Sequence, residues 1–346
     1  FVHAKSQDLD FVARERSGAR YAQAIFPALD AAGVWRNMAR NAAFGETGVP
    51  VEDARNRFEA AFTQLEKLDT ELGAGLGTTE RLNQVRVALQ SARSVQMTPD
   101  AVFQVMTGLS RAVVQLLDQV TDGSGLALDP ELHSYYLISA ALIHAPEIIA
   151  STAELRGLGG AALKSGKLAP ESAARIQERL AVVDHELTLA KNAIDKVSKA
   201  TPEYAKSMML SAPAATDSFG ALVRTTFPAG TTEPKGDRAT YVAAANQTLQ
   251  FQFAQVTKNL GVLDAMLADR QSNLHRSLMA TLTVTLLGVL LALYLFMGFY
   301  RSTTGGFKAL RRHLINISMG DLRADIKGGG KDEVAGLLKE LRNMQM

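Results

Sequence analysis

The feature that most constrains this chain is one uncharged apolar run towards its C-terminal end. From Ser277 to Tyr300 the sequence SLMATLTVTLLGVLLALYLFMGFY carries no charged residue over 24 positions. A helix of that length spans about 36 Å, which exceeds the roughly 30 Å hydrocarbon core of a bilayer. Buried helices of soluble proteins seldom have more than about 14 uninterrupted apolar residues, and Tyr294 and Tyr300 lie near one end, as interfacial anchors do. We therefore predict a transmembrane helix over residues 277–300.

The charges on either side of this run predict its orientation, because cytoplasmic flanks carry an excess of Lys and Arg. Upstream, Arg270 and Arg276 are accompanied by Asp264 and Asp269. Downstream, the residues before the first acid, Asp321, include four basic ones: Arg301, Lys308, Arg311 and Arg312. We expect residues 301–346 in the cytoplasm and residues 1–276 on the periplasmic side of the inner membrane. Such a topology requires a first transmembrane helix before Phe1, and we expect one there.

The composition favours helices and excludes several functional classes. Helix-forming residues fill long stretches with few β-branched runs, which predicts an all-α fold. The 37 basic and 35 acidic residues leave a formal charge of +2, too small for the phosphate contacts of nucleic-acid binding. The absence of Cys removes disulfides, thiolate metal sites and cysteine nucleophiles. No phosphate-binding loop, nucleophile elbow or HExxH motif occurs, so we expect no enzymatic activity, no cofactor and no bound metal.

Gly and Pro clusters divide residues 1–276 into amphipathic helices. We predict helices over about 2–44, 51–72, 79–96, 99–121, 130–164, 170–199, 202–226 and from about 239 into the membrane. Thr98 and Asp129 are the expected N-caps of the fourth and fifth helices, each followed by Pro. Both ends of the domain must meet the same membrane, so its antiparallel helices are even in number: eight, or six if two breaks are only kinks. Either number fits two stacked bundles that share long first and last helices.

The stretch GLALDPELHSYYL contains the first group of candidate ligand-binding residues. Asp129, His133 and Tyr136 are spaced so that a carboxylate, an imidazole and a phenol share one helix face, next to Tyr135. The functional interpretation is the wall of a ligand pocket. The alternative is a capped helix start whose tyrosines pack inside a bundle. A metal is not expected, because His144 lies about 16 Å along the helix from His133, too far for one ion.

Three arginines of the first helix form the second candidate group. Arg14, Arg16 and Arg20 crowd this helix beside Tyr21. Guanidinium groups meet carboxylates and other oxyanions with two hydrogen bonds, so inward-facing arginines predict an anionic ligand. The alternative is a solvated charged face with i,i+4 pairs. Neither group identifies the ligand, which could be a small molecule or a periplasmic protein.

Two short amphipathic helices follow the predicted membrane helix. Their apolar residues are spaced 3, 4, 3 along the chain: Phe307, Leu310, Leu314 and Ile317 in the first, and Val334, Leu337, Leu341 and Met344 in the second. This spacing is typical of a parallel coiled-coil-like bundle, and helices this short need partner chains to bury their apolar face. The sequence therefore predicts a homodimer.

This part of the chain, residues 301–346, resembles a HAMP domain, the relay module that follows the second transmembrane helix of bacterial receptors. The resemblance rests on Gly320-Asp321-Leu322, on Ile326, and on the run DEVAGL that begins at Asp332. It implies a parallel four-helix bundle in the dimer, and Ser302–Gly306 stands where the family has a proline. The relay residues that it implies are Leu310, Leu314, Ile317, Gly320, Asp321, Leu322, Ile326, Glu333, Val334, Leu337 and Leu341.

Two further segments resemble parts of bacterial receptors. LDPELHSYYL is similar to the pattern LDPDxDSYYL of sensor regions in proteobacterial chemoreceptors and some sensor kinases, with His133 in place of the second acid. The final LRNMQM is similar to the sequence leading into the methylation helices of methyl-accepting chemotaxis proteins. These likenesses imply a homodimeric chemotaxis receptor that assembles into arrays. The alternatives are the same front end on a histidine kinase or cyclic-dinucleotide enzyme, and a membrane scaffold without a ligand.

Overall fold

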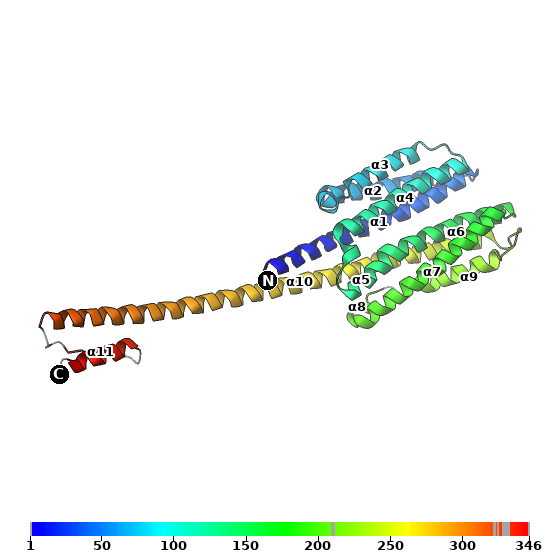
Figure 1. Ribbon diagram of the computed structural model, residues 1–346. Helices are drawn as coiled ribbons and strands as arrows, with labels where there is room; N and C mark the ends of the chain where they lie inside the picture. The colour runs from blue at the N-terminus through cyan, green and yellow to red at the C-terminus, as the bar shows by residue number, and fades with distance from the viewer. Residues whose placement is uncertain (1, 209–211, 321–322, 324, 327–332, 345–346) are drawn as a thin grey trace. The chain divides into compact units, whose positions relative to one another are not determined.

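The computed structural model describes residues 2–208, 212–320, 323, 325–326 and 333–344. Helices make up nearly all of this described part, and it contains no strand, so the predicted all-α fold is confirmed (Figure 1). The chain divides into two compact units, which are His3–Leu274 and His275–Met346 together with Phe1–Val2.

The helices of the chain follow one another closely. The first four are α1 (Val2–Ala43), α2 (Val51–Leu76), α3 (Thr79–Arg93) and α4 (Pro99–Ser124). A 3-10 turn, η1 (Leu126–Leu128), precedes α5 (Leu132–Ile138), the π-helical segment η2 (Ser139–His144) and α6 (Ala145–Ser165). The remaining helices are α7 (Pro170–Ala200), α8 (Pro202–Ala205), α9 (Ala212–Thr226), α10 (Arg238–Ser318) and α11 (Glu333–Met344).

Most helix ends follow the local signals of the sequence. Thr98 accepts a hydrogen bond from the Ala101 amide at 3.4 Å, and Pro99 is the first residue of α4, as predicted. Gly77 and Gly125 end α2 and α4 with left-handed φ angles of 67° and 83°, where a glycine avoids the steric cost of a Cβ. Non-helical residues 94–98 separate α3 from α4, so the chain has a true break here and not a kink. The sequence predicts eight helices when this break is present.

One prediction about the fifth helix is wrong, namely that Asp129 is its N-cap. The helix begins at Leu132 after Glu131, not after Asp129, because the Asp129 carboxylate is held by Arg270 at 3.3 Å and caps only a turn, accepting from the Glu131 amide at 2.8 Å. The helix also widens into η2 just before Pro146. A proline within a helix removes one i→i−4 hydrogen bond, and a π turn is one way for the chain to continue.

The first unit has two hydrophobic cores. The larger core joins α1–α4 with α5, η2 and the middle of α10, where Val256, Leu260 and Leu263 are buried. The smaller core joins α6, α7 and α9 with the start of α10, around Tyr241 and Ala245. Thus α7 and α10 contribute to both cores, whereas α1 contributes only to the larger one. The sequence predicts two stacked bundles that share the first helix as well as the last.

The first and last helices of this unit run antiparallel. Arg16 of α1 pairs with Asp264 of α10 at 3.1 Å, and Glu46, just after α1, pairs with Arg238 at the start of α10, also at 3.1 Å. Figure 1 shows α1–α4 as one group of helices and α6, α7 and α9 as another. The α1–α10 pair is the seam where these two groups meet.

Two helical stretches are long and apolar enough to cross a membrane, Leu132–Ser165 and Arg238–Ser318. In the first stretch, 56% of the most apolar window is buried inside the first unit, so we identify it as a core helix. In α10 none of the corresponding window is buried. Every large apolar side chain from Leu286 to Phe299 is more than half exposed. Within a single chain, no other described residues pack over this apolar run and bury it.

The second unit has a small core of its own, formed by Ile326 and three residues of α11, Val334, Leu338 and Leu341. Leu310 and Ile317 of α10 pack against it. A Cβ on Gly306 would lie 2.7 Å from Cγ1 of Val334, closer than carbon atoms approach one another. Gly306 therefore allows α11 to pack close to α10. It belongs to the segment Ser302–Gly306, which stands where HAMP domains have a proline.

Candidate functional site

The predicted arginine group does not converge on a pocket. Arg14 is exposed. Arg16 is held by Asp264 at 3.1 Å and by Gln271 at 2.8 Å, and Arg20 donates to both oxygens of Glu71, at 2.6 and 2.9 Å. Arg16 and Arg20 are therefore already neutralised by acids of neighbouring helices. The surface interpretation of this group describes its geometry better than the ligand interpretation.

The second predicted group is also spread over several contacts. Asp129 precedes α5, so it does not share a helix face with His133, which pairs with Glu131 at 3.1 Å. Lys196 donates to the Tyr136 hydroxyl at 3.0 Å and lies 4.2 Å from its ring centroid. Tyr135 meets the Tyr136 ring edge-on, with the centroids 5.7 Å apart, and is 39% exposed. Only Asp129 belongs to a buried charged cluster.

That cluster surrounds Arg270 of α10. Its Nη1 lies 3.3 Å from both Glu15 Oε2 and Asp129 Oδ1, and its Nε lies 3.2 Å from Glu131 Oε1. The side chains of Glu15 and Asp129 are fully buried. Burial and the neighbouring Asp129 carboxylate raise the pKa of the Glu15 carboxyl from 4.5 to about 8, because one guanidinium cannot compensate three carboxylates. The cluster joins α1, the loop before α5 and α10, which is a structural role.

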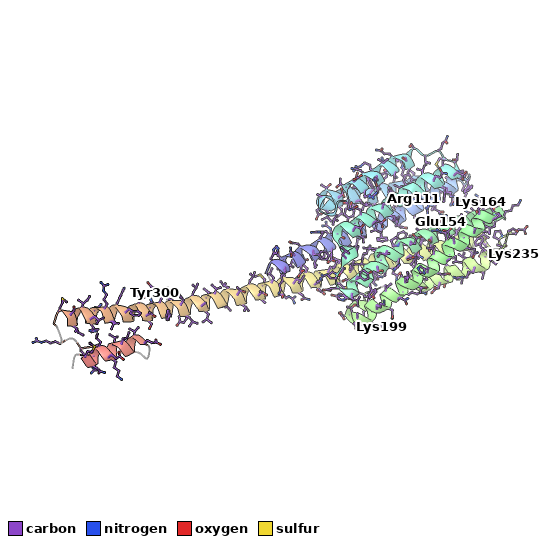
Figure 2. The ribbon with its side chains drawn as sticks, viewed as in Figure 1. Arg111, Glu154, Lys164, Lys199, Lys235 and Tyr300 are labelled. Atoms are coloured by element: carbon purple, nitrogen blue, oxygen red, sulfur yellow. The ribbon has the colours of Figure 1, made fainter. Side chains whose placement is uncertain are left out.

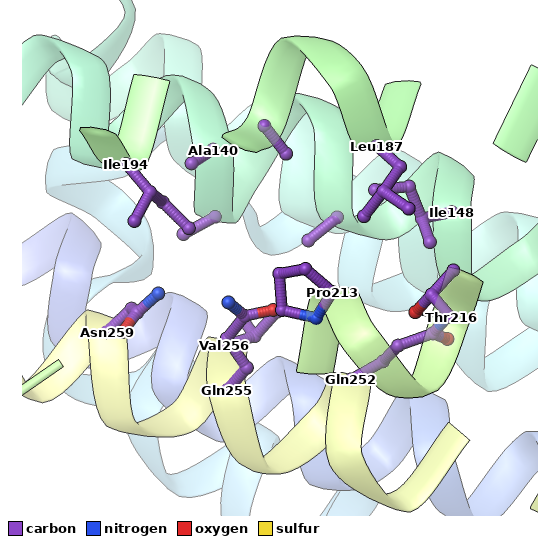
Figure 3. Close-up of a pocket in the computed structure, with 13 residues that line it drawn as sticks. Ala140, Ile148, Leu187, Ile194, Pro213, Thr216, Gln252, Gln255, Val256 and Asn259 are labelled. Atoms are coloured by element: carbon purple, nitrogen blue, oxygen red, sulfur yellow. Dashed lines mark hydrogen bonds between the residues drawn. The ribbon is translucent and has the colours of Figure 1, made fainter. Parts of the chain in front are cut away.

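A polar stripe on α10 faces the interior of the first unit near η2. Figure 3 shows Gln252, Gln255 and Asn259 directed towards a void lined by Ala140 and other residues of η2, α6, α7 and α9. Gln252 donates to the hydroxyls of Thr152 and Thr216, both at 3.1 Å. The void measures only about 20 Å³, which is room for about one water molecule. It is too small for an organic ligand.

A much larger cavity, which we name the arginine cavity, opens where the two groups of helices meet. Its volume is about 760 Å³ and its walls come from α1, α4, α6 and α10, with one arginine each from α2 and α7. Arg111 and Glu154, two of its lining residues, are labelled between the two groups in Figure 2. The charged side chains that line it are Asp30, Arg36, Arg40, Arg57, Arg111, Glu147, Glu154, Arg156 and Arg175. Guanidinium groups therefore outnumber carboxylates six to three.

All three carboxylates of the arginine cavity are already paired. Asp30 pairs with Arg57, Glu154 pairs with Arg175 at 2.6 Å, and Glu147 lies 3.5 Å from Arg179. Among the described residues, no carboxylate comes within ion-pairing distance of the remaining four arginines of the wall, which are Arg36, Arg40, Arg111 and Arg156. The cavity thus carries a net positive charge, which Asp30 and Glu154 offset only in part through weaker electrostatic interactions with Arg156 and Arg36.

Arg156 is the most deeply buried of these four, with 7% of its surface exposed. Its Nη1 donates to Asn246 Oδ1 at 2.7 Å and its Nη2 lies 3.5 Å from the Gly33 carbonyl oxygen. Its Nε is buried and has no hydrogen-bond partner among the described residues. Burial, reinforced by the nearby Arg36 and partly opposed by Asp30, lowers the pKa of Arg156 to about 10. This guanidinium is held in place by neutral groups and keeps donor capacity to spare.

Arg36 and Arg40 extend the positive charge along α1. Burial lowers the pKa of both. Glu154 partly opposes this effect on Arg36 and Asp100 partly opposes it on Arg40, whereas Arg40 adds to the effect on Arg36. The Arg40 guanidinium lies 5.2 Å from the ring centroid of Phe103. Sequence reasoning placed the anion site earlier on this helix, at Arg14, Arg16 and Arg20. A signal for the second site exists, since Arg36 and Arg40 are four residues apart, but no local pattern shows that Arg156 faces them from α6.

The described residues contain no group of His, Asp and Glu side chains that could hold a metal ion. Of the predicted relay residues, Leu310, Ile317, Ile326, Val334 and Leu341 pack together in the second unit. Leu314 and Leu337 are exposed, as is Glu333 at the start of α11, and Gly320 follows α10 with a left-handed φ of 82°. Asp321 and Leu322 lie outside the described residues.

Comparison with known proteins gives no assignment. The sequence matches no family model, and no curated protein or solved structure is significantly similar to it.

Proposed function

We propose that this chain is the sensor, membrane-spanning and relay portion of a homodimeric transmembrane receptor whose output is chemotaxis signalling. In this proposal residues 1–276 form a periplasmic sensor domain, 277–300 cross the inner membrane once, and 301–346 form a HAMP-type relay. The resemblances of DEVAGL, LDPELHSYYL and LRNMQM to receptor segments support it.

The observation that carries the proposal is the continuity of α10. Its start and middle lie in the two cores of the first unit, its bare apolar run follows, and Leu310 and Ile317 near its end pack in the core of the second unit. The helix has no proline between Arg238 and Ser318. A stimulus that shifts or rotates its periplasmic part would therefore move the relay segment as well, because a continuous hydrogen-bonded helix transmits such displacements.

The test is a fusion of residues 1–346 to the kinase-control module of a methyl-accepting chemotaxis protein, with the first transmembrane helix of that protein placed before Phe1, expressed in cells without chemoreceptors. We expect the fusion to restore kinase activity, measured as tumbling. Four glycines inserted after Arg276 should abolish this control, because they break the helix. Four alanines inserted at the same place keep the helix and rotate it by only about 40°, so they should preserve control.

A membrane-inserted fusion that leaves the cells smooth-swimming would contradict the chemotaxis output. Equal activity of the glycine and alanine insertions would contradict relay through α10. Regulated phosphorylation by a parallel fusion to a histidine kinase core, with no effect of the first fusion on tumbling, would favour the kinase alternative instead.

A further inference from the structure

The arginine cavity has the dimensions of a ligand site. Its volume of about 760 Å³ lies within the range of roughly 300–1,000 Å³ that small-molecule pockets occupy. Its wall includes the exposed Arg111 of α4 and the almost fully buried Arg156 of α6. The cavity therefore reaches from the surface of the unit to its interior.

The charge of the wall selects an anion. The three carboxylates of the wall form ion pairs with Arg57, Arg175 and Arg179. The buried Arg156 instead donates hydrogen bonds to a side-chain amide oxygen and a backbone carbonyl oxygen. Asp30 acts on the charge of Arg156 only from beyond ion-pairing distance. A buried guanidinium without a direct ion pair is costly, and an entering anion would supply that interaction. Arg36 and Arg156 line the same cavity, so one carboxylate in this cavity could interact with both.

The rest of the wall selects an apolar body. Large hydrophobic side chains from each of the four wall helices line the same cavity, among them Met38, Phe103, Val114, Ile149, Leu249 and Phe253. A fully hydrated inorganic anion would leave these side chains without contacts. An anion with a ring or alkyl chain would bury them while its carboxylate meets the guanidinium groups.

We propose that the arginine cavity binds a small monocarboxylate with an aromatic or alkyl body, whose carboxylate is bound by Arg156 and Arg36. This inference rests on the proposed function, since it names the ligand class of that receptor. Asn246, Leu249 and Phe253 of the wall belong to α10, so the bound molecule contacts the helix that continues into the apolar run. Occupancy would favour one packing of α10 against α1 and α6.

The test measures binding to the full 346-residue chain in detergent micelles by isothermal titration calorimetry. The probes are benzoate, hexanoate, inorganic phosphate and benzamide, which has nearly the shape of benzoate but no charge. We expect saturable binding of benzoate or hexanoate and no measurable binding of phosphate or benzamide.

Arg156→Gln should weaken carboxylate binding by at least about tenfold, because it removes a charge-assisted interaction. Arg36→Gln should also weaken it, and this variant provides an independent test if Arg156→Gln does not fold. The matched control is Arg14→Gln, which replaces an exposed α1 arginine that does not line the cavity and should leave binding unchanged.

Three outcomes would overturn the inference. They are binding of no probe, benzamide binding as tightly as benzoate, and carboxylate binding that survives both Arg156→Gln and Arg36→Gln. Phosphate binding without carboxylate binding would overturn the assigned class. The tumbling assay without ligand is a separate readout, so a failed titration beside an active fusion would reject this ligand class and leave the receptor proposal standing.

Discussion

At the scale of single residues, the cluster around Arg270 shows how burial changes the chemistry of a carboxyl group. Glu15 has a fully buried side chain and shares one guanidinium with Asp129 and Glu131. Its pKa of about 8 lies above the ordinary value of 4.5, so the folded protein binds a proton in this interval that the unfolded chain releases. The stability from this group is complete below about pH 4.5 and is lost as the pH rises through about 8.

Glu15→Gln should therefore flatten the pH dependence of stability. We expect the thermal unfolding midpoint of the wild-type chain to decrease as the pH is raised from 5 to 8. It should decrease less in Glu15→Gln, because this side chain cannot ionise. Circular dichroism on the full chain in detergent measures the midpoints. Glu71→Gln, which changes an exposed carboxylate paired with Arg20, is the control and should keep the wild-type slope. Equal slopes in Glu15→Gln and wild type would refute the buried proton.

At the scale of helices, the packing of α6 against α10 depends on a missing side chain. A Cβ on Gly159 would lie 2.5 Å from Cζ and Oη of Tyr241. The Tyr241 ring is buried between Phe219 and Phe227, with centroids 5.4 and 5.5 Å away, and its hydroxyl donates to the Leu155 carbonyl at 2.8 Å. The Gly159-Gly160 pair, which no phosphate-binding motif surrounds, therefore serves helix packing.

Gly159→Ala should lower the free energy of unfolding by about 1–3 kcal/mol, because overpacking here outweighs the better helix propensity of Ala. Gly108→Ala in α4 is the matched control, because no heavy atom lies within 4 Å of a Cβ there, and it should be neutral or stabilising by up to about 1 kcal/mol. Thermal unfolding of both variants measures the difference. Gly159→Ala with a midpoint equal to that of Gly108→Ala would show that the two helices can separate freely.

At the scale of the whole molecule, the second unit leaves apolar side chains without cover. Leu314 of α10 is 48% exposed and Leu337 of α11 is 46% exposed, although both belong to the 3, 4, 3 pattern that the sequence places in a bundle seam. Phe307 is likewise exposed. In the proposed homodimer a second copy would cover these positions.

Leu314→Lys should weaken dimerisation by at least about tenfold, because it puts a charge where about 2 kcal/mol of apolar burial is expected. Sedimentation of the full chain in density-matched detergent measures the monomer–dimer equilibrium. Lys339→Ala, a change at an exposed position of α11, is the control and should dimerise as wild type. A Leu314→Lys variant that also dimerises like wild type would place the dimer contact elsewhere.

The sequence predicted the start of α4 at Thr98-Pro99, where a local capping signal sets it. It placed the ends of α2 and α4 at about 72 and 121, whereas the helices continue to Leu76 and Ser124 and end at Gly77 and Gly125. It failed at Asp129, because the partner that displaces this residue from its capping role, Arg270, is 141 residues away in the chain. Arg16 and Arg20 were candidates for an anion site for the same reason, since Asp264 and Glu71 lie on other helices. The arginine side chains correctly indicated contacts with carboxylates. The sequence could not show that these carboxylates belong to the protein itself, because they lie on other helices.

Local sequence signals account for the all-α fold, most helix limits and the uncharged run of 24 residues, because propensity, capping and hydropathy act between residues close together in the chain. Which charges are compensated depends on how the helices pack in three dimensions. Arg270 is surrounded by carboxylates, whereas Arg36, Arg40 and Arg156 line one cavity with no carboxylate of the described residues within ion-pairing distance of them. Electrostatic balance is a sum over neighbours in space, and those neighbours come from helices far apart in the sequence.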